Sequence, residues 1–252
     1  MLKNRIIPIL LLKNGRCVKG RQFGNYRDTG APVTAAKIYD AQRVDELMFL
    51  DILASVERRS VLLDIVTETA KECFMPLTVG GGVKTIEDMK ILLAAGADKV
   101  SINTAAVEDP DFIKEAATYF GSANIVVSID YKQNNDGSRQ VYTHGGTKAT
   151  GKDPLVWAGE VASLGAGEIV LTSIDREGMM LGYDLEFIKI ITSALMIPVI
   201  AHGGAGTLAD LKQGIVEGGA SGVATASIFH FTDQSPIKAR WFLKDNGVNV
   251  RL

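Results

Sequence analysis

The chain has 252 residues, of which 46% are hydrophobic and 22% are charged, and its formal net charge at pH 7 is −2. This length accommodates either one α/β barrel or two small domains. Nucleic acids and anionic membranes both need clustered lysine and arginine, and the sequence has no basic run. We therefore expect no nucleic-acid partner and predict a small-molecule ligand.

Two further sequence features bear on where the protein works. Cys17 and Cys73 lack CxxC spacing, and no charged, apolar and small-residue leader is present, so neither a disulfide framework nor export is indicated. No apolar stretch approaches the roughly 20 residues that a membrane helix needs. The sequence thus predicts a reduced, cytoplasmic protein that does not span a membrane.

Short apolar runs recur along the chain with helical patterns between most of them. Runs rich in valine and isoleucine without polar alternation are typical of strands buried on both faces of a parallel sheet. Eight runs of this kind occupy residues 6–12, 46–50, 77–79, 99–102, 125–129, 169–173, 199–201 and 222–226. Eight strand–helix units predict a single (β/α)8 TIM barrel over residues 1–252, and an open doubly wound sheet is the alternative.

Two segments of the chain resemble each other. In both segments a proline, paired glycines, a threonine, an aspartate and a lysine coincide. Pro198 lies 122 positions after Pro76, and Thr207 lies 122 positions after Thr85. Each threonine precedes an apolar helical stripe, which begins at Ile86 in one copy and Leu208 in the other. This self-similarity predicts a duplicated half-barrel, so that chemistry at one site predicts a partner site.

Each half carries a glycine cluster after one strand and a small polar group after the next. The first half has residues 80–82 with Asn103 and Thr104, and the second has Gly203 and Gly204 with Ala226 and Ser227. Glycines let backbone N–H groups approach an anion, so each half is expected to cradle a phosphate. Tight turns without a ligand are the alternative interpretation.

Asp130 ends the fifth apolar run, at the barrel end where active sites are built. We predict a role in proton transfer for it, and a helix cap or loop ion pair is the alternative. The half-repeat aligns Asp130 with position 11, where a second carboxylate would be expected. Leucine stands there, and its side chain cannot carry a proton.

Over nearly its whole length the chain resembles the cyclase subunit of imidazole glycerol phosphate synthase. The matching stretches are RIIP, GRCVKG, DELMFLDI, PLTVGGGV, AGADKVSINTAAV, VYTHGG, GAGEIVLTSIDREG, GYDLE and HGGAG. The resemblance implies a barrel of the ribulose-phosphate-binding type without metal or cofactor. It implies a glutaminase partner, whose ammonia crosses the barrel to a bis-phosphorylated ribulosyl substrate, yielding imidazole glycerol phosphate and aminoimidazole carboxamide ribotide.

The resemblance also implies roles for individual residues. Asp130 and Lys19 match catalytic positions, and Lys19 matches a lysine on a mobile loop. Leu11 replaces the family's other catalytic aspartate. An ordinary solvated lysine is the alternative for Lys19.

One phosphate site is matched by Gly82, Asn103 and Thr104, and the other by Gly178, Gly204, Ala226 and Ser227. Beside the latter, Glu177 and His202 replace the commoner Asp and Ser, and a charged His202 would alter the pocket. A salt-bridge ring where ammonia enters is matched by Arg5, Glu46, Lys99 and Glu168, for which a stabilising polar plug is the alternative.

The LLLKNG start resembles a branch of this family linked to acetamidino sugars of O-antigen, a lipopolysaccharide component, and the loss of one acid favours that branch. There the barrel delivers ammonia from the glutaminase for modification of the sugar, and cyclase activity is weak or absent. The first alternative is the lyase of histidine biosynthesis, and the second is a related phosphosugar isomerase. Because ammonia in water is mostly protonated, we expect direct docking of the glutaminase at the N-terminal ends of the strands, near Asp98 and Lys99. We expect His144 to be a loop hydrogen-bonding residue rather than a base.

Overall fold

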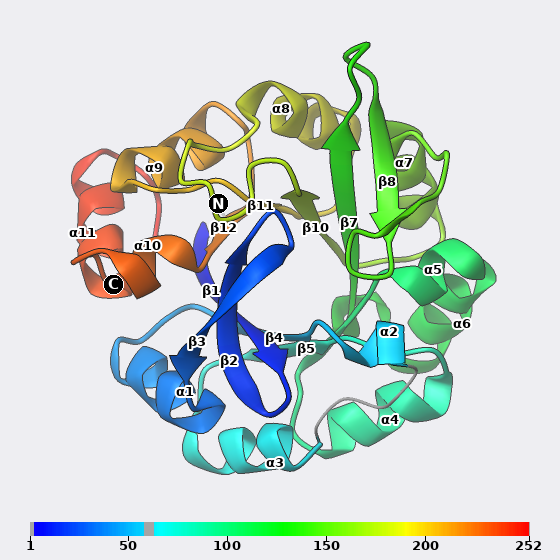
Figure 1. Ribbon diagram of the computed structural model, residues 1–252, viewed down its shortest axis with the longest axis horizontal. Coiled ribbons are helices and arrows are strands. Elements are labelled where there is room, and N and C mark those ends of the chain that lie inside the picture. The colour runs from blue at the N-terminus through cyan, green and yellow to red at the C-terminus, as the bar shows by residue number, and fades with distance from the viewer. Residues whose placement is uncertain (1–2, 58–62, 252) are drawn as a thin grey trace.

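The computed structural model describes residues 3–57 and 63–251, and within them eight parallel strands close into a barrel (Figure 1). Each strand pairs with its two neighbours, and pairing of β7 with β10 closes the sheet. In order around the barrel, the strands are β1 (Arg5–Lys13), β4 (Leu47–Asp51), β5 (Leu77–Gly80), β6 (Lys99–Ile102), β7 (Ile125–Gln133), β10 (Glu168–Ser173), β11 (Val199–His202) and β12 (Gly222–Thr225). The predicted (β/α)8 barrel is confirmed, and the open sheet is excluded.

A ring of helices surrounds the barrel, one after each barrel strand (Figure 1). They are α1 (Pro32–Ala41), α3 (Leu63–Glu72), α4 (Ile86–Ala94), α6 (Asp111–Phe120), α7 (Pro154–Ser163), α8 (Leu185–Ala194), α9 (Leu208–Val216) and α11 (Pro236–Asp245). Short helices lie in the connections: α2 (Ala54–Glu57), α5 (Thr104–Glu108), α10 (Ser227–Phe231) and the 3-10 turn η1 (Ser122–Asn124). None of the helices in the described part of the chain combines the length and the apolar character needed to cross a membrane.

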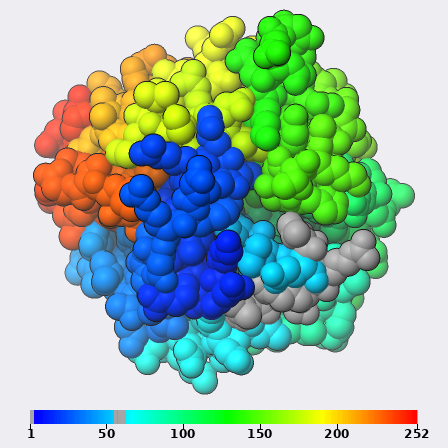
Figure 2. Space-filling view, viewed as in Figure 1, coloured from blue at the N-terminus to red at the C-terminus, as the bar shows by residue number. Residues whose placement is uncertain are grey.

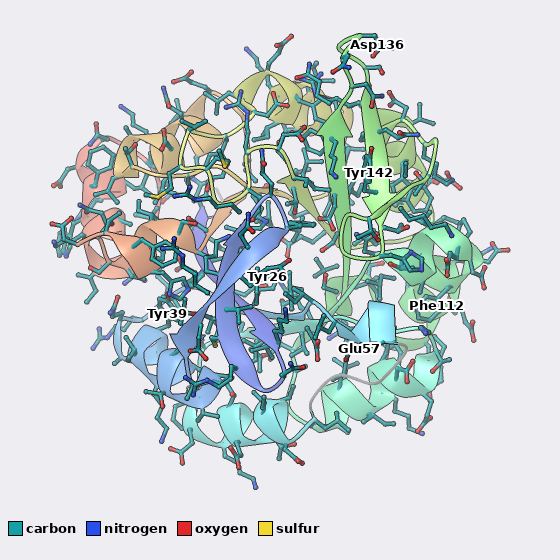
Figure 3. The ribbon with its side chains drawn as sticks, in the orientation of Figure 1. Tyr26, Tyr39, Glu57, Phe112, Asp136 and Tyr142 are labelled. Carbon is teal, nitrogen blue, oxygen red and sulfur yellow. The ribbon has the colours of Figure 1, made fainter. Side chains whose placement is uncertain are left out.

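Two antiparallel extensions of the barrel sheet were not predicted from the sequence. Strand β1 continues into β2 (Arg16–Arg21) and β3 (Gly24–Gly30), and β7 continues into β8 (Arg139–Thr143) and β9 (Lys148–Ala149). Asn14 and Gly15 join β1 to β2 with φ of 50° and 75°, the signature of a two-residue hairpin turn that the sequence already displayed. The β2–β3 hairpin lies across the centre of the barrel mouth (Figure 2), and Tyr26 projects from it there (Figure 3).

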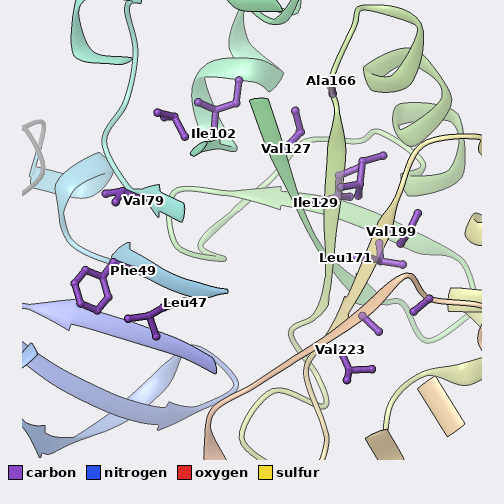
Figure 4. Close-up of a cluster of buried hydrophobic side chains, with 14 of the residues drawn as sticks. Leu47, Phe49, Val79, Ile102, Val127, Ile129, Ala166, Leu171, Val199 and Val223 are labelled. Carbon is purple, nitrogen blue, oxygen red and sulfur yellow. The ribbon is translucent and has the colours of Figure 1, made fainter. Parts of the chain in front are cut away.

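Apolar side chains occupy both faces of the barrel strands. Outward-facing residues such as Phe49, Val79 and Leu171 pack beneath the helices (Figure 4). Inward-facing side chains form a second cluster with Ile7, Ile9, Leu11, Val18, Met48, Val126, Val170, Ile200 and Ala224. Successive side chains on a strand point to opposite faces, so burial on both faces explains why the runs lack polar alternation.

The half-repeat is preserved in the backbone. Thr85 and Thr207 both cap nine-residue helices in reciprocal capping boxes, with φ and ψ of −134° and 160° in one and −133° and 162° in the other. Gly81 and Gly203 both have positive φ. A Cβ on Gly81 would lie 2.2 Å from the Asp51 carbonyl oxygen, and one on Gly203 would lie 2.6 Å from that of Ser173. Both turns therefore require glycine for the same reason, a close backbone approach.

The two caps yield a prediction about stability. Replacing Thr85 or Thr207 by alanine leaves a backbone N–H of the first helical turn without its side-chain acceptor. We expect each single substitution to lower the free energy of unfolding by about 1 kcal/mol, and the double variant by about 2 kcal/mol. Urea denaturation followed by circular dichroism measures this.

Thr118→Ala is the matched control, because the exposed Thr118 lies inside α6 and its hydroxyl only donates back to the Lys114 carbonyl. We expect its unfolding free energy to stay within about 0.5 kcal/mol of the wild type. Clearly unequal losses for the two caps would contradict the structural equivalence of the halves.

Candidate active site and ion-pair ring of the barrel

Four charged side chains form a ring at the N-terminal end of the barrel, called here the ion-pair ring: Arg5, Glu46, Lys99 and Glu168. Lys99 Nζ donates to Glu46 at 2.9 Å and to Glu168 at 3.0 Å. Arg5 likewise bridges the two carboxylates, donating to Glu46 at 2.8 Å. The structure thus brings together all four residues that the sequence assigned to a ring.

The two acids and two bases of the ring give it no net formal charge, and the acidic side chains are less exposed than the basic ones. The side chains of Glu46 and Glu168 are 2% and 7% exposed, whereas those of Arg5 and Lys99 are 23% and 20% exposed. Thr78 Oγ1 adds a 2.6 Å hydrogen bond to Glu46. Each buried carboxylate is therefore matched by partly solvated cations, which lowers the cost of holding charge in the barrel.

The opposite end of the barrel opens into a cavity of about 280 Å³. Asp130, Leu11 and the first phosphate site expected from the sequence all line it. Much of its wall is apolar, with Phe23, Tyr26, Leu50, Ile52, Val83, Ile102 and Phe112. A concave, largely apolar pocket with a few converging polar groups is typical of a small-molecule site.

Asp130 lines this cavity and is held by neutral side chains. Asn103 Nδ2 donates to Asp130 Oδ2 at 2.8 Å, and Thr172 also hydrogen-bonds the carboxylate. Burial raises the pKa of Asp130 to about 6, although these two hydrogen bonds oppose the shift. A carboxyl with such a pKa is able to exchange protons near neutral pH.

Leu11 faces the same cavity from the other side of the barrel. Strands β1 and β7 lie four strands apart in a closed ring of eight, so their inward side chains oppose each other. Leu11 is 6% exposed and packs in the inner apolar cluster with Val18 and Leu50. Both Leu11 and the side chains around it are thus apolar.

Gly82, Asn103 and Thr104, called here the first cradle, line the large cavity beside Lys84. Gly82 has φ of 71°, and Thr104 Oγ1 accepts a hydrogen bond from His144 N at 3.1 Å. Asn103 Oδ1 is buried without a hydrogen-bond partner. The first cradle therefore combines open space with unused polar capacity.

Gly178, Gly204, Ala226 and Ser227, called here the second cradle, lie together around a separate small cavity of about 10 Å³. Lys19, Glu177 and His202 line the same cavity. The Lys19 ammonium forms an ion pair with the Glu177 carboxylate, and both side chains are 2% exposed. The structure brings the predicted residues together, with the ion pair among them.

Two sequence interpretations are corrected here. Lys19 is not a solvated lysine, because β2 carries it into the interior, where burial lowers its pKa to about 8. His202 is not charged near neutral pH. Burial lowers its pKa to about 3, assisted by the charge of Lys19. His202 Nδ1 shares a 3.2 Å hydrogen bond with Thr172 Oγ1.

Sequence reasoning missed two polar residues near Asp130. Thr172 links Asp130 to His202, and Tyr26 reaches the cavity from β3. Burial, together with the charge of Asp130, raises the pKa of the Tyr26 phenol. The position of Thr172 near a strand end was an available signal, whereas nothing local marked Tyr26. His144 is a loop hydrogen-bonding residue, as predicted, through Thr104 and Thr143.

Cys17, Cys73 and Asp98 are not among the residues that line this cavity. Cys17 and Cys73 are free and buried. Within residues 3–57 and 63–251, no group of three or more His, Cys, Asp and Glu side chains is placed to hold a metal ion. Asp98, expected near a partner contact, is exposed, and its carboxylate accepts a hydrogen bond from Leu77 N at 2.8 Å.

The family model described as "Histidine biosynthesis protein" matches residues 5–235. The match begins at Arg5 of the ion-pair ring and spans all eight barrel strands, Asp130 and both cradles.

From the contacts of the ion-pair ring we expect one substitution, at Glu46, to destabilise the protein strongly. Glu46→Gln leaves Arg5 and Lys99 facing one carboxylate. We expect the free energy of unfolding to fall by about 2 kcal/mol, less than for a fully buried pair because both cations keep some solvent contact. Urea denaturation measures the loss.

Glu72→Gln supplies the comparison, because Lys37 and Glu72 form a 3.0 Å pair in which both side chains are half-exposed. We expect a loss of less than about 0.5 kcal/mol there. Equal losses at positions 46 and 72 would show that the ring contributes no more than a surface pair.

Because the pKa of Asp130 is raised, we expect the stability of the protein to depend on pH. Its folded-state pKa of about 6 lies above the ordinary value of 3.8, so the folded chain binds the proton more tightly than the unfolded chain. This contribution is therefore complete below about pH 4 and is lost as the pH rises through about 6. Between those limits we expect the wild type to lose about 2 kcal/mol relative to Asp130→Asn. Urea denaturation across this range measures the difference.

Asp245→Asn controls for a generic loss of a carboxylate, because Asp245 is exposed at the end of α11. The stability difference of Asp245→Asn from the wild type, measured over the same pH range, is the background against which the Asp130→Asn difference is compared. A constant difference for Asp130→Asn would mean that Asp130 has an ordinary pKa.

Proposed function

The chain belongs to the histidine biosynthesis protein family, whose members are usually enzymes, and from this premise we propose that it is an ammonia-delivering barrel subunit. In this role it receives ammonia from a glutaminase that docks at the N-terminal end of the barrel. It passes the ammonia toward the opposite end for acetamidino modification of a surface-glycan sugar. Its own cyclase activity is weak or absent.

The side chain at position 11 carries this proposal. A ring-closing reaction with an acid–base pair needs two groups that exchange protons, and Asp130 supplies one of them. Leu11 occupies the opposite wall, in contact with other apolar side chains. Loss of one acid or base typically lowers a rate by a factor of about 10² to 10⁴. Delivery of ammonia needs no such pair.

The ion-pair ring and the barrel interior support the transport step. Ammonia in neutral water is mostly ammonium, which is not a nucleophile, so it has to pass directly between subunits. The inner cluster beyond the ring is apolar, with Ile7, Met48 and Val170 among its members. Such surroundings favour neutral NH3 over NH4+, because burying an unpaired charge is costly.

The large cavity supports a phosphorylated small molecule as the ligand of the barrel mouth. The first cradle lines that cavity, close to the cationic Lys84 and to Asp130. A ligand anchored there would reach both Asp130 and the inner end of the barrel. We assign Gly82, Asn103 and Thr104 to phosphate binding and Asp130 to the reacting end of the site. Lys19, the other catalytic candidate, lines the small cavity of the second cradle instead.

The alternative function is the cyclase subunit of imidazole glycerol phosphate synthase in histidine biosynthesis. One observation favours it, the raised pKa of Asp130 in a pocket of suitable size. An acid prepared in this way has no purpose in a passive conduit. The same observation fits a separate proton-transfer role toward the delivered ammonia.

A glutaminase assay distinguishes the two functions. The purified barrel, combined with a glutaminase of the amidotransferase class, is expected to stimulate glutamine hydrolysis. We expect the complex to form imidazole glycerol phosphate at least about 10²-fold more slowly than a family cyclase that carries both acids, because Leu11 cannot transfer a proton. Asp130→Asn is expected to leave glutamine hydrolysis unchanged.

That family cyclase, treated identically, is the positive control for imidazole formation. Imidazole formation by the wild-type chain at the control rate would establish the histidine-pathway function instead. Failure to stimulate any glutaminase would remove the ammonia-delivering role.

A further inference from the structure

We propose that the Lys19–Glu177 ion pair closes the second cradle, so that the barrel mouth accepts a ligand with one phosphate, held at the first cradle. This inference rests on the part of the proposed function that assigns a phosphorylated ligand to the mouth. It narrows the ligand class from bis-phosphorylated to mono-phosphorylated molecules.

The two cradles differ sharply in free space. The cavity at the first cradle measures about 280 Å³, and that at the second about 10 Å³. A cavity needs at least about 10–15 Å³ to hold one water molecule. A phosphate group, with its four oxygens, is several times larger than water. The second cradle therefore has no room for a phosphate while the ion pair is in place.

The charges around the second cradle also disfavour a phosphate. The Lys19 ammonium would attract the anion, but its charge is already matched by Glu177. His202 and His230 are neutral, because burial and the charge of Lys19 lower both pKa values, to about 3 and about 4. An incoming phosphate would thus meet a buried carboxylate and no free cation among these groups.

Glu177 already acts as the anion of this site. It is 1% exposed and lines the cavities at both cradles, and its Oε2 is buried without a hydrogen-bond partner. An unsatisfied carboxylate oxygen in a closed space is costly, and proteins retain such groups where they serve a purpose. Here the carboxylate takes the place, beside the ammonium, that a ligand's anionic group would need.

Backbone contacts hold both members of the pair in position. Gln22 N donates to the Glu177 carbonyl at 2.8 Å, and Gln22 Nε2 donates to the Asp175 carbonyl at 2.8 Å. Gly178 has φ of 72° and lies so close to β2 that a Cβ would be 2.2 Å from the Gly20 carbonyl oxygen. The β2–β3 hairpin is thus docked on the turn that carries Glu177, and the pair is part of the fold.

The lining of the cavity also indicates the chemistry of the part of the ligand that lies away from the first cradle. Beyond the first cradle the cavity wall is largely apolar, and Glu177 and His202 form part of its far side. This end suits an uncharged group rather than a second dianion. A sugar monophosphate fits this description.

Phosphate stoichiometry tests the inference. Isothermal titration of the purified chain with inorganic phosphate is expected to give one site in the wild type and two in Glu177→Ala, where the space opens and Lys19 is freed. Glu177→Gln keeps the volume and removes only the charge, so we expect one site. Glu160→Ala, which removes a partly exposed glutamate on α7, is the matched control and is also expected to give one site.

A second measurement uses the wild type as its own reference, in case Glu177→Ala does not fold. Ribulose 1,5-bisphosphate is expected to bind within about threefold of ribose 5-phosphate, since the second phosphate gains no contact. In Glu177→Ala or Glu177→Ser the bisphosphate is expected to bind at least tenfold more tightly, which corresponds to about 1.4 kcal/mol.

The outcomes separate this inference from the proposed function. Two phosphate sites in the wild type, or a tenfold preference of the wild type for the bisphosphate, would overturn the closed second cradle alone. Absence of phosphate binding in every variant would overturn the phosphorylated ligand as well. Glutaminase stimulation is measured independently and is affected by neither result.

Discussion

Closure of the barrel between β7 and β10 is the constraint on which the rest of the structure depends. Closure shields most inward-facing side chains from bulk water, so each charge inside has to be paired, placed near an end or neutralised. At the N-terminal end, two acids and two bases form the ion-pair ring. At the other end, Lys19 pairs with Glu177. Asp130 is instead held by the neutral side chains of Asn103 and Thr172, and the same burial raises its pKa.

Asp130 bears directly on the function of the barrel. Asp130 faces Leu11 across the mouth, and the leucine continues the apolar inner cluster up to the reacting end of the site. The barrel combines an ion-pair ring, an apolar interior and a cavity lined by Asp130 with an aliphatic side chain at position 11. Our proposal of ammonia delivery reconciles these features, because transport depends on the interior whereas ring closure depends on the missing acid.

The duplicated halves show how far side chains diverge on a shared backbone. The capping boxes at Thr85 and Thr207 are almost superimposable in their dihedral angles, and Gly81 and Gly203 make the same close approach. The cradles beside them nevertheless differ in the space they leave. Backbone geometry is fixed by steric limits that any sequence in this fold meets, whereas the contents of a cradle depend on one or two side chains.

The sequence by itself determined the barrel, the repeat and the opposition of Leu11 to Asp130, because these follow from local hydrophobic patterns and from spacing that a symmetric fold preserves. The four residues of the ion-pair ring were expected from the family resemblance rather than from a local pattern. The sequence also contains the Asn14–Gly15 turn, a local signal for the hairpin between β1 and β2. Only the tertiary structure decided that Lys19 meets Glu177, that His202 is neutral and that Tyr26 enters the cavity. These facts depend on how the β2–β3 hairpin docks on a turn more than 150 residues away in the chain. The hydrogen bond from Gln22 to the Asp175 carbonyl is one such contact. No local pattern encodes such a contact, because burial and pairing are properties of the assembled space.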